Sequence, residues 1–298
     1  MTGLGLSSTQ PSLVLPINSS VKVAAKSVRG SVGGVEKPNN QDTCFTIEAS
    51  GWHFLGVCDG HGLFGHHVSG YLKAVLPRLL FDTLSLGGAE QAAETLKTAY
   101  ALAVKGLKST PVDCSNSGST CVTVLWQGTS LVCGNVGDSR AVIGKRINGN
   151  WHHSDLSTDH KPDLPREKGR IEAAGGEVSV SKFTQLGPAR VYLRNEPFPG
   201  LAMSRSIGDE VSKTVGVTAD PDILQYTVSR EDKFLILASD GVWEFISSLE
   251  AVKIVGLHWE QGEAGKACAA LVRAAQLRWA SCDNMVDDIT AVIAFLNA

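Results

Sequence analysis

Hydrophobic and polar residues along this chain of 298 residues follow two spacings, one typical of helices and one of strands. Apolar residues at three- and four-residue steps predict helices over 68–80, 92–107, 249–259 and 264–280, with a shorter helix near 167–174. Short β-branched or apolar runs predict strands over 43–47, 52–58, 120–126, 131–136, 140–145, 233–239 and 289–295. Ser50 and Gly51 separate the first two strands and predict a hairpin turn.

The order of these elements favours an α+β fold. Strands, two helices, strands, two helices and a last strand do not alternate strictly, which argues against a doubly wound parallel sheet. Two antiparallel sheets flanked by helix pairs agree better with this order. No repeat with a period of about 20 to 50 residues is present, which excludes solenoids and propellers.

Two segments lack this regular pattern. Residues 1–20 are rich in Ser, Thr, Gly and Pro, and we expect a flexible N-terminal leader followed by a single domain over 21–298. The segment 161–215 is dense in Pro, Gly and charge, and outside its one short helix we expect a covering loop.

Composition excludes several classes of protein. With 43% hydrophobic and 19% charged residues the chain can bury a core, and a net charge of −3 gives no basic field to attract nucleic acid. No apolar run approaches the roughly 20 residues of a transmembrane helix. The start lacks a secretory signal, and Thr2 excludes N-myristoylation. No heptad pattern stands out, so we expect a monomer.

The cysteines indicate a reducing compartment. There are seven, an odd number, and none forms a Cys-x-x-Cys pair. We interpret them as free thiols in the core rather than as zinc ligands or disulfides. A cytoplasmic or nuclear location, or both, is therefore expected.

Four aspartates fall at strand ends or just before a strand: Asp59, Asp138, Asp240 and Asp287. Any one of them alone is most simply a turn-capping acid. Carboxylates gathered at sheet ends repel one another unless a cation neutralises them, and all-oxygen ligation favours Mg²⁺ or Mn²⁺. Two such ions lower the pKa of a shared water and stabilise in-line displacement at phosphorus.

The run Asp59-Gly60-His61-Gly62 adds a candidate proton donor. The glycines on either side of His61 predict a tight turn and leave a backbone carbonyl free to face a metal. A single histidine in a turn is usually inert, but this one lies two residues from a predicted metal ligand. We interpret His61 as a general acid for a leaving alkoxide.

A series of motifs in this order resembles the type 2C (PPM family) metal-dependent serine/threonine protein phosphatases. The similarity runs from about residue 37 to 293, nearly the whole chain. The motifs are Asn40-Gln41-Asp42, Val57-Cys58-Asp59-Gly60-His61-Gly62, Ser117-Gly118-Ser119-Thr120, Asn135-Val136-Gly137-Asp138-Ser139-Arg140-Ala141, Asp159-His160-Lys161-Pro162, Ala173-Ala174-Gly175-Gly176, Leu201-Ala202-Met203-Ser204-Arg205-Ser206-Ile207-Gly208-Asp209, Ala238-Ser239-Asp240-Gly241-Val242-Trp243-Glu244 and Asp287-Asp288-Ile289-Thr290.

The resemblance implies a central β-sandwich of two antiparallel sheets flanked by helix pairs, with two Mn²⁺ or Mg²⁺ ions at one end. It implies that Asp59 bridges both ions and that the Gly60 carbonyl binds one of them. Asp240 and Asp287 would then bind the other ion, and Asp42 would act through bound water. Asp138 and Asp240 match the positions that support a weaker third ion.

The chain departs from the family pattern at two positions. Lys37 stands where many members place an arginine that grips the substrate phosphate, and it lacks the planar bidentate fork of arginine. The alternative is a solvated lysine. Asp288 replaces a frequent asparagine and adds a negative charge beside Asp287. The stretch 183–209 matches the family's flap, where we expect substrate choice to be made, and Arg205 either braces this flap or contacts phosphate.

These residues lead to a hypothesis of direct hydrolysis of phosphoserine and phosphothreonine in proteins. A metal-bridging hydroxide attacks phosphorus in line, Lys37 and the ions neutralise charge, His61 protonates the leaving oxygen, and no phosphoenzyme forms. Two alternatives are a catalytically silent phosphatase-like binding protein and a two-metal nuclease or phosphodiesterase. The presence of every expected acid argues against the first, and the acidic charge balance argues against the second.

Overall fold

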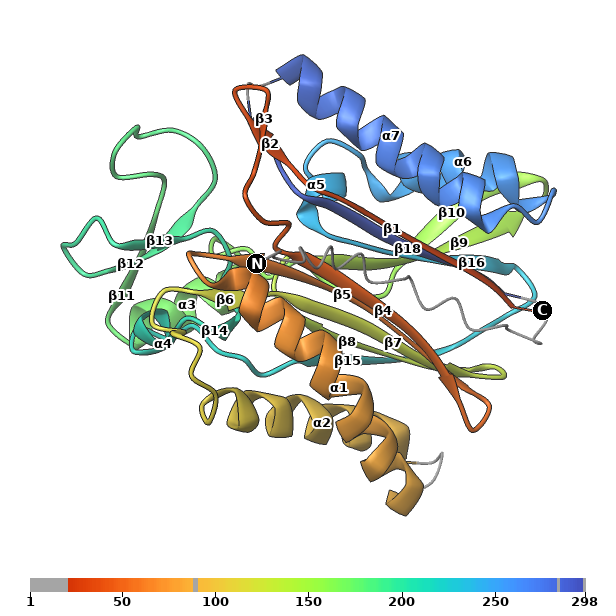
Figure 1. Ribbon diagram of the computed structural model, residues 1–298, viewed down its shortest axis with the longest axis horizontal. Helices are drawn as coiled ribbons and strands as arrows, with labels where there is room; N and C mark the ends of the chain where they lie inside the picture. Colours follow the sequence, from red (N-terminus) through yellow and green to blue (C-terminus); the bar gives the residue numbers. More distant parts are fainter. Residues whose placement is uncertain (1–20, 88–90, 283–284, 297–298) are drawn as a thin grey trace, which may run out of the picture.

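The computed structural model describes residues 21–87, 91–282 and 285–296, and these form four layers. Two large antiparallel sheets are stacked face to face, with one helix pair on each outer side (Figure 1). The predicted α+β sandwich flanked by helix pairs is thereby confirmed. The predicted leader, residues 1–20, lies outside the described residues.

The first sheet has five strands in the order β1-β18-β16-β9-β10. Its central strand β16 pairs with β18 on one side and β9 on the other, both antiparallel. The strands are β1 (Lys22–Val28), β9 (Arg140–Ile147), β10 (Asn150–Asp155), β16 (Asp232–Ala238) and β18 (Ile289–Phe295).

The second sheet has seven strands in the order β14-β6-β5-β7-β8-β15, with β4 paired to β5. The long strand β5 is central because it pairs with β4, β6 and β7. The strands are β4 (Asp42–Ala49), β5 (Trp52–His61), β6 (Gly118–Ser119), β7 (Cys121–Gln127), β8 (Ser130–Val136), β14 (Ile207–Gly208) and β15 (Asp222–Thr227).

Alternation along the strands divides the core between two faces of each sheet. In β16, Phe234 and Ile236 pack toward the helices, whereas Leu235 and Leu237 pack against the second sheet. All four side chains are fully buried. A strand with two buried faces is the reason for the nearly continuous apolar run that predicted it.

The helices cover the outer faces of the sandwich. One pair, α1 (Gly65–Gly87) and α2 (Ala92–Leu107), packs on the second sheet. The other pair, α6 (Ser248–Trp259) and α7 (Ala264–Cys282), packs on the first sheet. At the start of α6 the Ser247 side chain accepts the backbone N–H of Glu250, which is an ordinary N-cap. No described helix is both long enough and apolar enough to span a membrane.

The predicted covering loop over 161–215 is more ordered than expected. It contains a small three-stranded sheet that stands beside the sandwich (Figure 1) and packs its own apolar cluster around Ile171 and Val191. Its elements are α3 (Pro165–Ala173), β11 (Gly176–Ser179), β12 (Arg190–Leu193), β13 (Pro199–Leu201), β14 and α4 (Glu210–Lys213). The expectation of a plain loop was wrong because four-residue strands carry too short a pattern to detect.

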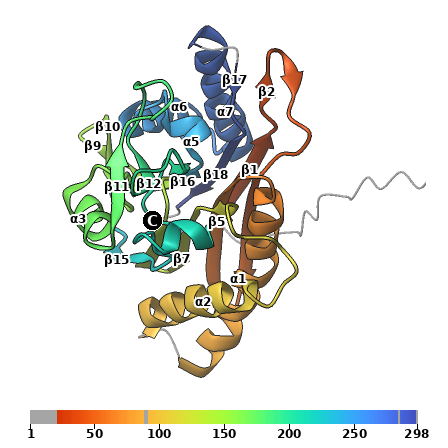
Figure 2. The same ribbon diagram turned by 90° about the vertical axis from the view of Figure 1, so that its left-hand side faces the viewer.

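A second small sheet lies beside the end of α7 (Figure 2). It consists of β2 (Ser31–Val32), β3 (Val35–Glu36) and β17 (Met285–Val286). In the sequence, β2 and β3 lie between β1 and β4, and β17 lies between α7 and β18. These connections directly precede Asp42 and Asp287, which belong to the candidate site described below. The remaining helix, α5 (Asp240–Trp243), directly follows β16.

Candidate active site

Five aspartates from both sheets lie close enough to influence one another electrostatically. Asp42 and Asp59 are direct cross-strand partners in β4 and β5. Asp138 follows β8, Asp240 begins α5 just after β16, and Asp287 lies between β17 and β18. The sequence prediction that widely separated acids converge is consistent with this placement, and we call these five residues the acidic cluster.

Burial and mutual repulsion raise the pKa values of several of these carboxyls. The pKa of Asp59 lies well above its usual value, first because the group is buried and then because Asp42, Asp240, Asp287 and Asp138 surround it. Burial also raises the pKa of Asp42 to about 7 and that of Asp240 to about 8. Such a cluster is electrostatically unfavourable until cations or protons neutralise it.

The donor atoms of the cluster suit hard cations. The Oδ1 atoms of Asp42, Asp138 and Asp240 are buried and have no hydrogen-bond partner within the described chain. Buried polar atoms are normally satisfied, so these oxygens have coordination capacity to spare. Among the described residues no group of three or more His, Cys, Asp or Glu side chains is placed so that it could hold a metal ion as it stands. The individual ligand assignments therefore stay predictions.

Neighbouring groups fix Asp42 and Gly60 in place. The Ser239 hydroxyl donates to Asp42 Oδ2 over 2.7 Å, and Ser239 in turn accepts the backbone N–H of Thr290. Gly60 lies against Gly65 and Gln41 so tightly that a Cβ would come within 2.4 Å and 2.7 Å of their carbonyl oxygens. Only glycine fits there. Strand β5 continues through His61, and of the two glycines beside His61 it is Gly62 that has a positive φ, 79°.

Lys37 faces the acidic cluster. Its ammonium donates to Asp287 Oδ1 and lies 3.8 Å from Asp288 Oδ2. Burial by itself lowers the pKa of Lys37, but the adjacent carboxylates outweigh it and raise the pKa overall. Lys37 is therefore not the freely solvated lysine of the alternative interpretation, while its contact with substrate phosphate stays a prediction.

A second lysine, which the sequence analysis did not single out, pairs with the cluster. Lys161 Nζ donates to Asp138 Oδ2 over 2.5 Å, and Asp138 is only 1% exposed. The signal was present in the motif Asp159-His160-Lys161-Pro162. No role was assigned to Lys161, because nothing in the sequence indicates that residue 161 lies close to residue 138.

Asp288 has a structural role that its sequence position did not reveal. One carboxylate oxygen accepts the backbone N–H of Gly30 over 2.6 Å, and the other accepts that of Gln41 over 2.9 Å. The side chain is 4% exposed. Asp288 thus joins the segments that precede β2 and β4, and an asparagine would offer only one acceptor oxygen for these two donors.

His61 is paired with a carboxylate that the sequence analysis missed. His61 Nε2 lies 2.6 Å from Asp209 Oδ2, while Nδ1 is buried without a hydrogen-bond partner in the described part of the chain. Burial by itself lowers the pKa of His61, but Asp209 outweighs it and raises the pKa. Asp209 is the last residue of the motif that ends in Ile207-Gly208-Asp209. Its place in that motif was the sequence signal that could have identified it.

Arg205 braces the flap. It is 2% exposed and binds Glu167 through Nε and Nη2, with a shortest distance of 2.8 Å. Its Nη1 donates to Asp222 Oδ1 and to the carbonyl oxygen of Asp220. This arrangement supports the bracing interpretation, because the guanidinium already has protein partners on both sides.

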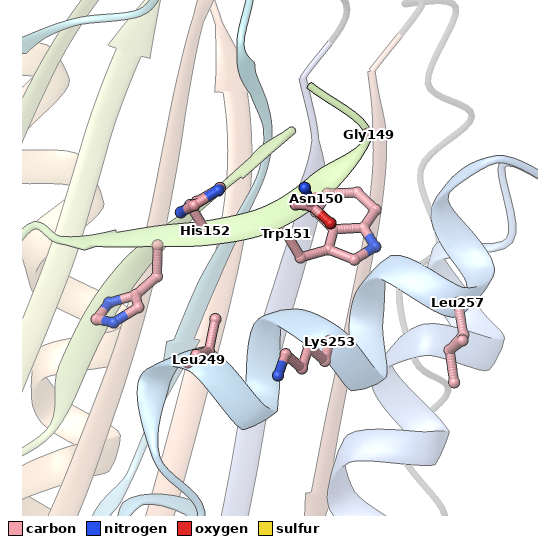
Figure 3. A pocket seen from close by; sticks show the side chains of 8 residues that line it. Gly149, Asn150, Trp151, His152, Leu249, Lys253 and Leu257 are labelled. Carbon is pink, nitrogen blue, oxygen red and sulfur yellow. The ribbon is translucent and has the colours of Figure 1, made fainter. Parts of the chain in front are cut away.

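A groove on the described surface lies away from the acidic cluster. It has a volume of about 740 Å³ and runs between β10 and α6, lined by Trp151, His152, Leu249, Lys253 and Leu257 among others (Figure 3). None of the acidic cluster lines it. A catalytic metal centre for phosphate esters is a polar, strongly charged place, and we therefore assign the chemistry to the acidic cluster rather than to this groove.

Comparisons with known proteins agree on one family. The sequence model described as "Protein phosphatase 2C" matches residues 29–285. The chain is 38% identical over 271 residues to "Probable protein phosphatase 2C 64" of Oryza sativa subsp. japonica, covering 87% of this chain and 62% of that protein. It is also 38% identical over 285 residues to "Probable protein phosphatase 2C 72" of Arabidopsis thaliana, covering 90% of this chain and 85% of that protein.

Solved structures share the fold. The crystal structure of serine-threonine phosphatase 2C from Toxoplasma gondii matches with a TM-score of 0.78 and 24% identity, and the match covers 93% of this chain and 95% of that one. A sex-determining protein of C. elegans matches with a TM-score of 0.77 and 20% identity, over 94% of this chain and 65% of that one.

Proposed function

Because the chain belongs to the protein phosphatase 2C family and is a protein serine/threonine phosphatase, we propose that it hydrolyses phosphoserine and phosphothreonine in proteins with Mn²⁺ or Mg²⁺ at the acidic cluster. The observation that supports this most directly is the set of buried carboxylate oxygens on Asp42, Asp138 and Asp240 that have no hydrogen-bond partner among the described residues. They offer the hard ligands that such ions require.

The proposed ligands are taken from the family positions that this sequence matches. Asp59 would contact two ions, with the Gly60 carbonyl on one and Asp240 and Asp287 on the other. Asp42, held by Ser239, would act through water, and Asp138 with Asp240 would support a weaker third ion. When bound, such ions lower the pKa of water and neutralise charge on the phosphoryl group.

The chain's own residues would orient the substrate and move the proton. Lys37 places a positive charge beside Asp287, where it can also attract the phosphate. His61 supplies the proton that the departing serine or threonine oxygen needs. The flap, residues 183–209, stands beside these groups and presents Phe183 and Phe198 to solvent, so it can contact the polypeptide around the phosphorylated residue.

The test is phosphate release from a phosphothreonine peptide during titration with Mn²⁺ or Mg²⁺. We expect activity to depend on the added metal and Asp240→Asn to lower kcat/KM by at least about 10²-fold, as expected when a metal ligand is lost. Asp163→Asn is the matched control, because Asp163 is exposed and does not belong to the acidic cluster.

Three results would refute the proposal. Activity that is undiminished in excess EDTA would exclude the metal-dependent scheme. A wild-type protein that cleaves bis(p-nitrophenyl) phosphate but not the phosphopeptide would instead identify a phosphodiesterase, and one that cleaves neither while binding the phosphopeptide would identify a binding protein.

A further inference from the structure

We propose that Asp209 is the positioning residue for His61, holding the imidazole by Nε2 so that the Nδ1 proton is the one delivered to the leaving oxygen. This inference rests on the proposed function. It concerns a residue outside the acidic cluster, and it follows from how the end of β5 and the short strands β6 and β14 bring residues 61, 118 and 209 together.

The backbone places the two side chains on opposite sides of β6, one at the end of β5 and one just after β14. His61 ends β5 and is paired with Gly118 of β6, which is paired with Gly208 of β14 (Figure 1). Asp209 follows directly, in the left-handed conformation with φ 49° and ψ 51°. Its N–H donates to the carbonyl oxygen of Ser117 over 3.0 Å. Aspartate is among the few residues with a side chain that adopt this conformation readily.

Gly118 is the residue that permits the contact. A Cβ at this position would lie 2.1 Å from Asp209 Oδ2 and 2.5 Å from Ser206 Oγ. The Asp209 carboxylate therefore crosses β6 through the space that a side chain at 118 would fill. Two strands separated by a third can exchange a side-chain hydrogen bond here only because the middle strand carries glycine.

The resulting pair has the features of an oriented proton donor. The Nε2 to Oδ2 distance of 2.6 Å is that of a charge-assisted hydrogen bond, and Asp209 is 2% exposed. A protonated imidazole carries a hydrogen on each nitrogen. The Nε2 hydrogen is held by Asp209, so the Nδ1 hydrogen, which has no partner within the described chain, is the one available for transfer.

The proton balance is simple. As the bond between phosphorus and the serine or threonine oxygen breaks, that oxygen takes the Nδ1 proton and leaves as a neutral alcohol. Water supplies OH to phosphorus, and its remaining proton restores His61. Asp209 stays ionised throughout and stabilises the imidazolium, which is the role of an orienting carboxylate in other acid–base pairs.

The decisive experiment compares two leaving groups. The alkoxide of a phosphothreonine peptide needs a proton to leave, whereas p-nitrophenolate leaves without one. We expect Asp209→Asn, which retains size and left-handed preference, to lower kcat/KM for the peptide by about 10²-fold, within the range for general acid catalysis. For p-nitrophenyl phosphate the same variant should lose less than about 3-fold, because that reaction does not draw on the acid.

Two further variants separate positioning from structure. Glu210→Gln removes the same charge one residue away, from a carboxylate that pairs with Lys213 and Lys108, and both substrates should be hydrolysed at the wild-type rate. If Asp209 acts through His61, then Asp209→Asn should have no added effect in the His61→Gln background. An equal loss on both substrates, or additive losses in the double variant, overturns the proposal.

A spectroscopic readout keeps the inference independent of activity. The Nε2 hydrogen bond should give a downfield, slowly exchanging imidazole proton in NMR spectra of the wild-type protein, and this signal should be missing in Asp209→Asn. A wild-type protein that hydrolyses neither substrate refutes the proposed function, but the signal still tests the pair. Its absence from the wild type overturns the inference in either case.

Discussion

The most informative single substitution for the stability of this phosphatase is Glu167→Gln. Glu167 is 2% exposed and accepts hydrogen bonds from Arg205, from Arg170 Nη2 over 2.7 Å and from Ser204 Oγ over 2.6 Å. Glutamine has nearly the same shape but carries one acceptor oxygen, two N–H donors and no charge. It would therefore present a donor to a buried guanidinium.

The magnitude follows from what remains around Arg205. Removing one partner of a buried ion pair costs about 3–5 kcal/mol of unfolding free energy. Asp222 and the Asp220 carbonyl still bind Nη1 of Arg205 in the variant, which favours the lower end of that range. We expect a loss of about 3 kcal/mol, equivalent to a fall of roughly 6 °C in Tm for a chain of this size.

The pH dependence supplies a second, independent measurement. Burial by itself raises the pKa of Glu167, but hydrogen bonds from Arg205, Arg170 and Ser204 outweigh it and hold the pKa far below the ordinary 4.5. The group therefore contributes its full stability above the unfolded pKa and loses it as pH falls. The difference in unfolding free energy between wild type and Glu167→Gln should be largest at pH 7 and shrink below about pH 4.5.

Urea unfolding followed by fluorescence, at several pH values, measures both effects. Glu172→Gln is the matched control, because Glu172 lies on the same helix but pairs with Lys168 at the surface, and such a pair contributes less than about 1 kcal/mol. If Glu167→Gln unfolds at the wild-type urea concentration, or if its deficit does not change with pH, the buried network does not stabilise the fold as argued.

Three further predictions concern other parts of the molecule. Asp288→Asn should cost about 1–3 kcal/mol in urea unfolding, because one of two buried backbone N–H groups loses its acceptor. Gly256→Ala should destabilise by about 1–3 kcal/mol, since the new Cβ would lie 2.3 Å from the Trp151 ring, whereas Gly265→Ala faces open space and should be neutral or stabilising. Mn²⁺ should raise Tm in the wild type and do so less in Asp240→Asn, as measured by differential scanning fluorimetry.

Each of these has a clear contrary outcome. Wild-type stability of Asp288→Asn would mean that an asparagine meets both backbone donors. An unchanged Gly256→Ala would mean that α6 can move away from β10 without loss of packing (Figure 3). An equal metal-induced shift in wild type and Asp240→Asn would remove Asp240 from the proposed ligand set.

Some strands were beyond the reach of the sequence pattern. Neither β1, β10 nor β15 was predicted, and all three are edge strands of the large sheets. Their burial alternates weakly, as in β10, where no side chain is fully buried. An edge strand contacts the core on one side only, so its residues need not be apolar, and its conformation is decided by the neighbour to which it hydrogen-bonds.

The same distinction between what the sequence predicts and what the tertiary structure decides applies to the fold as a whole and to the candidate site. The sequence alone predicted the layered α+β fold, because strands buried on both faces and amphipathic helices must carry the hydrophobic periods that were observed. It also predicted that the aspartates of the acidic cluster converge, because their placement at strand ends and the motif order do not depend on tertiary detail.

Only the tertiary structure decided how those acids are partnered. Lys161 reaches Asp138 across 23 positions of sequence, and Asp209 reaches His61 across 148. Such contacts depend on strand order and on the absence of a side chain at Gly118, neither of which a local pattern encodes. The residue type of a side chain limits the chemistry that the side chain can perform. The path of the chain through space determines which other group it performs that chemistry with.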